Sequence, residues 1–108
     1  MSETNYKTEK LLAGEIKTNQ MPLAAGTYRR GQVLEFDADN NRYTALASGS
    51  ISAVFLGETT TLENGDVDSL ILGGELFGGG LVDSAGDAYT VTPAFIASAA
   101  IRGFYIKK

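Results

Sequence analysis

Alternating apolar and polar positions predict a body built from short β-strands. In GQVLEFDADNNRYTAL, residues 31–46, two apolar runs flank a polar turn, which is the pattern of a β-hairpin. ISAVFLGETTT, residues 51–61, is apolar on both faces at its centre, as is typical of a central strand. VDSLILGGELF, residues 67–77, predicts a further strand, and Asn64-Gly65 before it is a strong signal for a tight turn. We therefore expect a mainly β fold, a small mixed β barrel or sandwich-like domain.

One short C-terminal helix gives this fold some α+β character. In TPAFIASAAIRG, Thr92 can cap the first turn and Pro93 suits the first helical position. Gly103 follows the predicted helix, at the position where many helices end in a residue with a left-handed backbone conformation. FYIKK then predicts a short final strand.

The first twenty residues, MSETNYKTEKLLAGEIKTNQ, are mostly polar. Leu12 and Ile16 are spaced as on one face of a helix, but Gly14 interrupts the pattern and the segment is short for an isolated helix. We expect residues 1–20 to form a loose, extended N-terminal arm and residues 21–108 to form a compact β-rich domain. Such an arm orders on binding and can add a strand to a partner sheet. A disordered terminus without a role fits the sequence equally well.

The glycine-rich stretch LILGGELFGGGLV, residues 70–82, raises the question of a phosphate loop. A P-loop needs Lys and Ser or Thr after its last glycine, whereas Leu81 and Val82 follow Gly80 here. The spacing of a dinucleotide-binding fingerprint is absent as well. Glycines in strands more often mark bulges, bends or close backbone approach. We expect a sharp bend that leaves Phe77 and Leu81 in the core or in a contact.

The amino-acid composition limits which catalytic and metal-binding sites the chain can form. The sequence contains no His and no Cys, which removes the usual general base near neutral pH, the commonest metal ligand and any thiolate. Asp37, Asp39 and Asn41 match the first ligands of an EF-hand loop, but Arg42 and Ser48 stand where that loop needs Gly and Glu. A hairpin turn is the better interpretation. We assign no catalytic, cofactor-binding or metal-binding residue and expect no cofactor.

The formal net charge is −4, which disfavours sequence-independent DNA binding because that needs a basic face. The lysines lie near the two ends, at positions 7, 10, 17, 107 and 108. No apolar run approaches the roughly 20 residues that cross a bilayer, and the polar start lacks the apolar stretch of a secretory signal. We expect a soluble protein used inside a cell or in a particle assembled there.

Five pieces of the chain carry a resemblance in their order and spacing, namely KLLAGEI, AAGTYRRGQVLEFDADNNRYTAL, SAVFLGETTT, DVDSLILGGELF and TPAFIASAAIRGFYIKK. Together these pieces resemble bacteriophage head decoration proteins of the lambda D-protein type. They contain a G-x-V-L hairpin start at Gly31 to Leu34, an aromatic residue after the turn at Tyr43, an apolar strand at Ala53 to Gly57 and a Gly-acid-apolar piece at Gly74 to Leu76. The resemblance covers the chain from Tyr6 to its end.

The resemblance implies a structural virion protein and not an enzyme. Proteins of this type bind the exterior of the expanded head as trimers at three-fold or quasi-three-fold sites. They stabilise the shell against the pressure of packaged DNA. The implied partners are the major capsid protein and further copies of the chain, with no direct contact to nucleic acid and none to a membrane. The implied location is the outer surface of the capsid, after synthesis in the host cytoplasm.

The resemblance also implies that the N-terminal arm contacts the shell, often by adding a strand. By position this role falls on Tyr6, Lys7, Lys10, Leu11, Leu12 and Ile16. Candidate contacts within the trimer or with the capsid are Arg29, Arg30, Phe77 and Leu81. The loop GGGLVDSAGDAYT departs from the family, in which this region is often rich in Pro, Ala and aromatic residues, so no contact of that loop is carried over.

Two functions of other classes stay open. A carbohydrate- or ligand-binding β module of a phage fibre or tail would need a cleft with clustered exposed tyrosines, drawn from Tyr6, Tyr28, Tyr43, Tyr89 and Tyr105. A small hydrolase would need two carboxylates to meet, drawn from Glu35, Glu58, Glu63, Glu75 and Asp83. Glu75 lies in an apolar stretch, and we expect it to point outward; the alternative is a buried pair with Arg29, Arg30 or Arg102.

Overall fold

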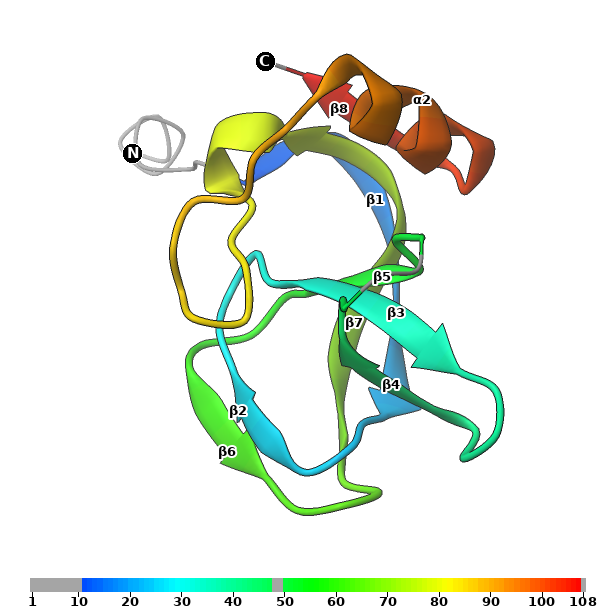
Figure 1. The fold of residues 1–108 in the computed structure, drawn as a ribbon, viewed down its shortest axis with the longest axis vertical. Coiled ribbons are helices and arrows are strands. Elements are labelled where there is room, and N and C mark those ends of the chain that lie inside the picture. The colour runs from blue at the N-terminus through cyan, green and yellow to red at the C-terminus, as the bar shows by residue number, and fades with distance from the viewer. Residues whose placement is uncertain (1–10, 48–49, 108) are drawn as a thin grey trace.

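Strands make up most of the molecule in this computed structural model, which describes residues 11–47 and 50–107 (Figure 1). The elements are β1 (Leu12–Pro22), β2 (Gly26–Tyr28), β3 (Val33–Asp37), β4 (Arg42–Ala45), β5 (Ala53–Phe55), β6 (Thr60–Leu62), β7 (Val67–Phe77), the 3₁₀ turn η1 (Gly78–Gly80), α2 (Pro93–Ile101) and β8 (Phe104–Lys107). The predicted fold class, mainly β with one short C-terminal helix, is confirmed.

The main sheet has the strand order β1-β7-β5-β3-β4, and all these pairs are antiparallel. β8 adds to β7 in parallel, and β2 pairs with β6 in a separate two-stranded sheet. After β1, the N–H of Ala24 donates to the carbonyl oxygen of Tyr43 at 2.9 Å, so the sheet curls until its two ends approach each other (Figure 1). The predicted central position of β5 is confirmed, since it pairs with β3 and β7.

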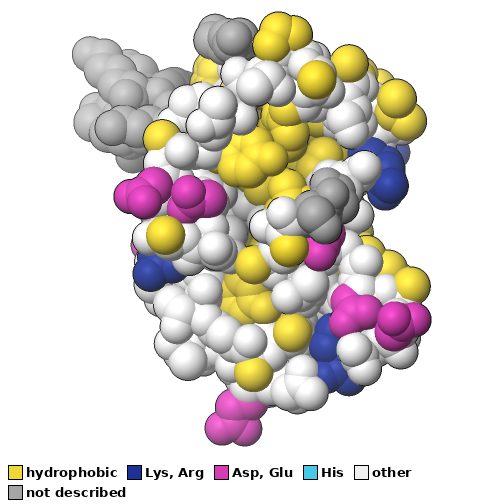
Figure 2. Space-filling view, viewed as in Figure 1, with side chains coloured by type: hydrophobic (Ala, Val, Ile, Leu, Met, Phe, Trp, Pro, Cys, Tyr) yellow, Lys and Arg dark blue, Asp and Glu magenta, His cyan; other side chains and the backbone are white. Residues whose placement is uncertain are grey.

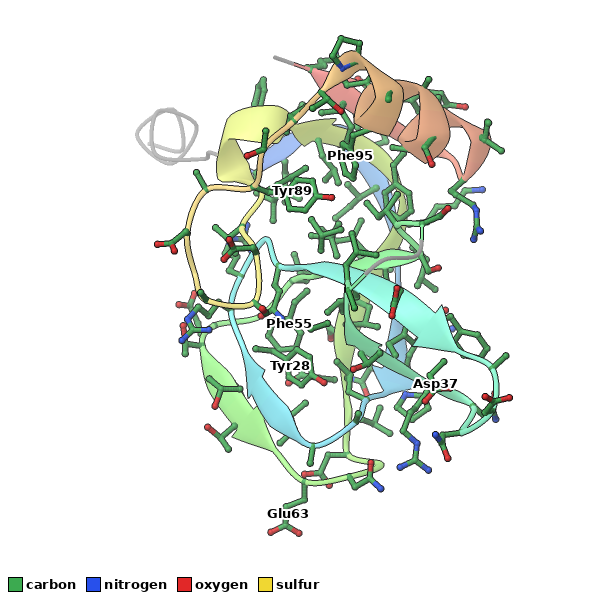
Figure 3. The ribbon with its side chains drawn as sticks, in the orientation of Figure 1. Tyr28, Asp37, Phe55, Glu63, Tyr89 and Phe95 are labelled. Atoms are coloured by element: carbon green, nitrogen blue, oxygen red, sulfur yellow. The ribbon has the colours of Figure 1, made fainter. Side chains whose placement is uncertain are left out.

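Two apolar clusters fill the space inside this curled sheet. One lies under α2 and η1 and includes Val54, Leu76 and Phe104. The other lies under β2 and includes Tyr28, whose ring stacks on Phe55 with centroids 5.5 Å apart. Figure 3 shows Tyr28 and Phe55 below Tyr89 and Phe95, one pair in each half of the molecule.

The expectation of a loose arm over residues 1–20 is wrong for residues 12–20. These residues belong to β1, the antiparallel partner of β7, in a register that pairs Leu12 with Leu76 and Gln20 with Ser69. Leu11, just before β1, is buried in the first apolar cluster. The body therefore begins at about position 11, and only residues 1–10, which lie outside the described part of the chain, are left to an arm.

The glycines of β7 serve close backbone approach, as predicted. The β1–β7 register shifts between Leu12 and Ile16, where extra β1 residues bulge out. Opposite this bulge Gly74 has φ +124°, and a Cβ there would collide with the carbonyl oxygen of Glu15 and the Cα of Ile16. Gly78–Gly80 forms η1, which turns the chain sharply after Phe77.

The local signals for the hairpin and the helix are confirmed. Asp37 ends β3 and its Oδ1 accepts the backbone N–H of Asp39 at 3.1 Å, while Asn41 has the positive φ of 57°. At α2, Thr92 Oγ1 accepts the N–H of Phe95 at 3.1 Å. Gly103 after the helix has φ +88°.

Candidate interaction face

One end of the molecule is exposed but almost free of charge. Residues 76–82 and 88–101 contain no Asp, Glu, Lys or Arg, and they form the end of β7, η1, the segment before α2, and α2. We call this surface the uncharged end. Figure 2 shows apolar and neutral side chains over it, with most charged side chains below. Depletion of charge is typical of the centre of a protein interface.

Large apolar side chains of the uncharged end reach solvent. Ile101, the last residue of α2, is 84% exposed, and Phe77, the last residue of β7, is 38% exposed. An isolated exposed apolar residue is ordinary, but exposed apolar residues on a surface that lacks charge point to a contact.

A shallow hollow of about 280 Å³ lies in the same end, lined by Gly78, Gly79, Tyr89 and Val91. The Tyr89 and Phe95 rings lie 4.8 Å apart and cover the first apolar cluster (Figure 3). Because a Cβ on Gly79 would meet nothing within 4 Å, a partner side chain has room beside η1.

Phe77 also lies between the first and last residues of the described chain, Leu11 and Lys107. Its N–H donates to the carbonyl oxygen of Leu11 at 2.8 Å, and its register partner on the other side is Lys107 of β8. Residues 1–10 therefore join the body beside Phe77. Three predicted arm residues, Tyr6, Lys7 and Lys10, lie outside the described residues.

Several residues that the sequence predicted to contact the capsid or a second copy instead pack within their own chain. Leu11 is 2% exposed and Leu81 is fully buried, both in the first apolar cluster. Leu12 and Ile16 are half-buried against that cluster. Of the apolar residues predicted to make contacts within the described chain, Phe77 has the most accessible side chain because it ends β7 at the rim of the sheet.

Arg29 and Arg30 brace loops of their own chain. Arg29 Nη1 donates to the carbonyl oxygen of Ser84 at 2.9 Å, and Arg30 Nη1 donates to the carbonyl oxygen of Leu56. The backbone N–H of Arg29 donates to Oε1 of Gln32, a side chain that is 1% exposed. Both arginines are thus primarily structural, although a guanidinium retains further donors.

A second depression, of about 350 Å³, lies where β1, β7, β8 and the end of α2 meet, and we call it the β8 groove. Its lining residues are Glu15, Ile16, Lys17, Leu72, Gly73, Gly74, Glu75, Arg102, Gly103 and Tyr105. Glu75 points outward, as predicted, and its Oε1 pairs with Lys107 Nζ at 2.8 Å rather than with an arginine. Tyr105 is 57% exposed. The uncharged run of residues 88–101 could have drawn attention to Ile101, but nothing local in the sequence marks Tyr105 or the groove.

The polar residues of the β3–β4 turn serve the turn itself. Asp37 Oδ2 accepts Nδ2 of Asn40 at 2.8 Å, and this hydrogen bond is the main cause that lowers the pKa of the Asp37 carboxyl. Within residues 11–47 and 50–107, no group of three or more acidic side chains is placed to hold a metal ion. The same residues include no helix with the length and apolar character to cross a membrane.

The tyrosines named for a ligand cleft do not cluster on the described surface. Tyr28 is 3% exposed in the core, and burial raises the pKa of its hydroxyl. Tyr43 and Tyr89 are half-buried, each against a different apolar cluster, so Tyr105 is the exposed tyrosine among residues 11–47 and 50–107. Comparisons of the chain with models of protein families, with curated proteins and with solved structures find no match.

Proposed function

We propose that the chain is a structural virion protein that binds the exterior of the expanded phage head as trimers at three-fold or quasi-three-fold sites and stabilises the shell against internal DNA pressure. The proposal rests on the order of sequence pieces that resembles head decoration proteins. The observation that carries it is the uncharged end, where exposed Phe77 lies beside the point at which residues 1–10 join the body.

This end suits a contact with a shell for physical reasons. Burying Phe77 and the Tyr89 hollow removes apolar surface from water, and none of the residues that line the hollow is charged. Many identical copies on one lattice gain strength by avidity, so each contact can be modest.

A binding assay with expanded heads of the parent phage tests the proposal. Wild-type protein and Phe77→Ser are mixed with heads, and the occupancy of sedimented heads is measured against protein concentration. Loss of the Phe77 contact should weaken binding about tenfold, the effect of about 1.4 kcal/mol. Val67→Ser is the matched control, because Val67 is 54% exposed and begins the same strand that Phe77 ends.

The outcomes of this assay test the virion function and the role of the uncharged end separately. A wild-type protein that ignores heads rules out the function. Binding that is unchanged in Phe77→Ser, or weakened equally in Val67→Ser, keeps the function and removes the uncharged end as the docking face. The carbohydrate-binding alternative needs a cluster of exposed tyrosines, whereas Tyr105 is the exposed tyrosine among residues 11–47 and 50–107.

A further inference from the structure

The β8 groove contains charged side chains that have no partner within the described part of the chain. The side chains of Lys17 and Arg102 form no hydrogen bond or ion pair with the described part of the chain. Glu75 is neutralised by Lys107 at 2.8 Å. The charges that face a ligand are therefore two cations, Lys17 and Arg102, and one anion, Glu15.

An exposed aromatic side chain lies at the same place. Tyr105 lines the groove and is 57% exposed. Tyr and Arg in one exposed cluster are the residue types that most often dominate protein interfaces. The groove is thus suited to a convex protein segment with an aromatic residue and a mostly acidic tip.

The β3–β4 turn of the same chain has these properties. It projects from the body as a hairpin (Figure 1). Phe36 beside it is 41% exposed and rests on Tyr43, with ring centroids 5.0 Å apart. Asp39 is exposed and its carboxylate has no partner in the described chain, whereas the Asp37 carboxylate is held by Asn40. Arg42 adds one cation, so the turn offers two anions and one cation against the groove's two cations and one anion.

We propose that the β8 groove receives the β3–β4 turn of a second copy of this chain. Asp39 of the second copy pairs with Arg102 and Lys17, Arg42 faces Glu15, and Phe36 packs on Tyr105. Groove and turn are different patches, so the contact is heterologous, and the proposed trimer requires that its rotation close into a ring. This inference rests on the proposed trimer and assigns the surfaces that join its subunits.

Charge reversal in the free full-length protein tests the contact. Self-association is followed by the concentration dependence of amide NMR shifts, and the amides of Gly103, Tyr105, Ala38 and Asp39 should move with one common midpoint. Asp39→Lys and Arg102→Glu should each weaken association about fivefold or more, and the double variant should recover most of that loss. Glu63→Lys, in the acidic turn at the start of β7, is the control and should leave the midpoint unchanged.

Three results would overturn the contact. They are absence of concentration-dependent shifts up to millimolar protein, shifts that map to other turns, and a double variant no stronger than the single variants. Each of these leaves head binding untouched, since that is measured separately with Phe77→Ser. Conversely, a charge-swap rescue in a protein that ignores heads supports the contact between copies and rejects the virion function.

Discussion

The carbonyl oxygen of Leu11 accepts a 2.8 Å hydrogen bond from the N–H of Phe77, which fixes the start of the described chain to the last residue of β7. The Leu11 side chain is buried, while that of Phe77 reaches solvent. The described chain thus begins with a residue of the core, and β1 follows it directly from Leu12.

Two truncations should separate these parts. Removing residues 1–10 should leave the midpoint of urea unfolding unchanged. Removing residues 1–17 should lower the free energy of unfolding by several kcal/mol, since it exposes the cavity left by Leu11, and a buried leucine alone contributes about 2 kcal/mol. Equal unfolding midpoints for the two truncated proteins would contradict the assignment of residues 12–17 to the sheet.

Gly74→Ala should destabilise the β1–β7 pair. Gly74 has φ +124°, and the new methyl group would collide with the backbone of Glu15 and Ile16. We expect a loss of about 2 kcal/mol or more in the free energy of unfolding, measured by urea denaturation. Gly79→Ala is the control: Gly79 has neither a positive φ nor a neighbour within 4 Å of the added Cβ. A loss of the same size in both variants would argue against close approach as the role of Gly74.

Thr92→Ala should weaken the start of α2. The Thr92 hydroxyl accepts the N–H of Phe95 at 3.1 Å, and loss of such a cap costs about 1 kcal/mol. The change should lower the thermal unfolding temperature, measured by calorimetry, and should speed amide exchange in the first turn of the helix. Thr90→Ala, an exposed threonine outside the helix, should do neither.

Alkaline pH should weaken the half of the core that contains Tyr28. Its hydroxyl donates to the carbonyl oxygen of Ala24 at 2.7 Å, and burial raises its pKa above the ordinary 10.0. The folded state therefore holds the proton more tightly than the unfolded state. This contribution to stability is complete below pH 10.0 and is lost as pH rises through the folded pKa.

Urea unfolding of wild type and Tyr28→Phe across this range checks the effect. The variant should be less stable near neutral pH, by about 1 kcal/mol for the lost hydrogen bond. The difference should shrink above pH 10.0, where the wild-type hydroxyl ionises on unfolding. Parallel curves at all pH values would exclude Tyr28 as a source of alkaline sensitivity.

Elements with local signals could be predicted from the sequence. The cap residue Thr92, Pro93 and Gly103 define both ends of α2, because capping depends on residues within one turn of the helix. The β3–β4 hairpin follows in the same way from Asp37 and Asn41, whose side chains favour the turn conformation.

β1 could not be predicted in this way. A spacing of four between Leu12 and Ile16 places both on one face of a helix and also on one face of a strand. The pattern alone therefore does not distinguish a helix from a strand here. The pairing of Leu12 with Leu76 and of Ile16 with Gly74, 64 and 58 residues further along the chain, makes this segment a strand. That pairing depends on Gly74, where the two backbones come close enough to exclude a side chain.

The sequence by itself determined the fold class, the hairpin, the helix and the lack of charge in residues 88–101, because each depends on residue type and short spacing. Only the tertiary structure decided that Leu81 is buried while Phe77 is exposed, since burial depends on which elements cover a side chain. It also decided that Lys17, Arg102 and Tyr105 line one groove. Lys17 lies more than eighty residues before Arg102 and Tyr105, and only the packing of β1, β7, β8 and α2 brings it beside them.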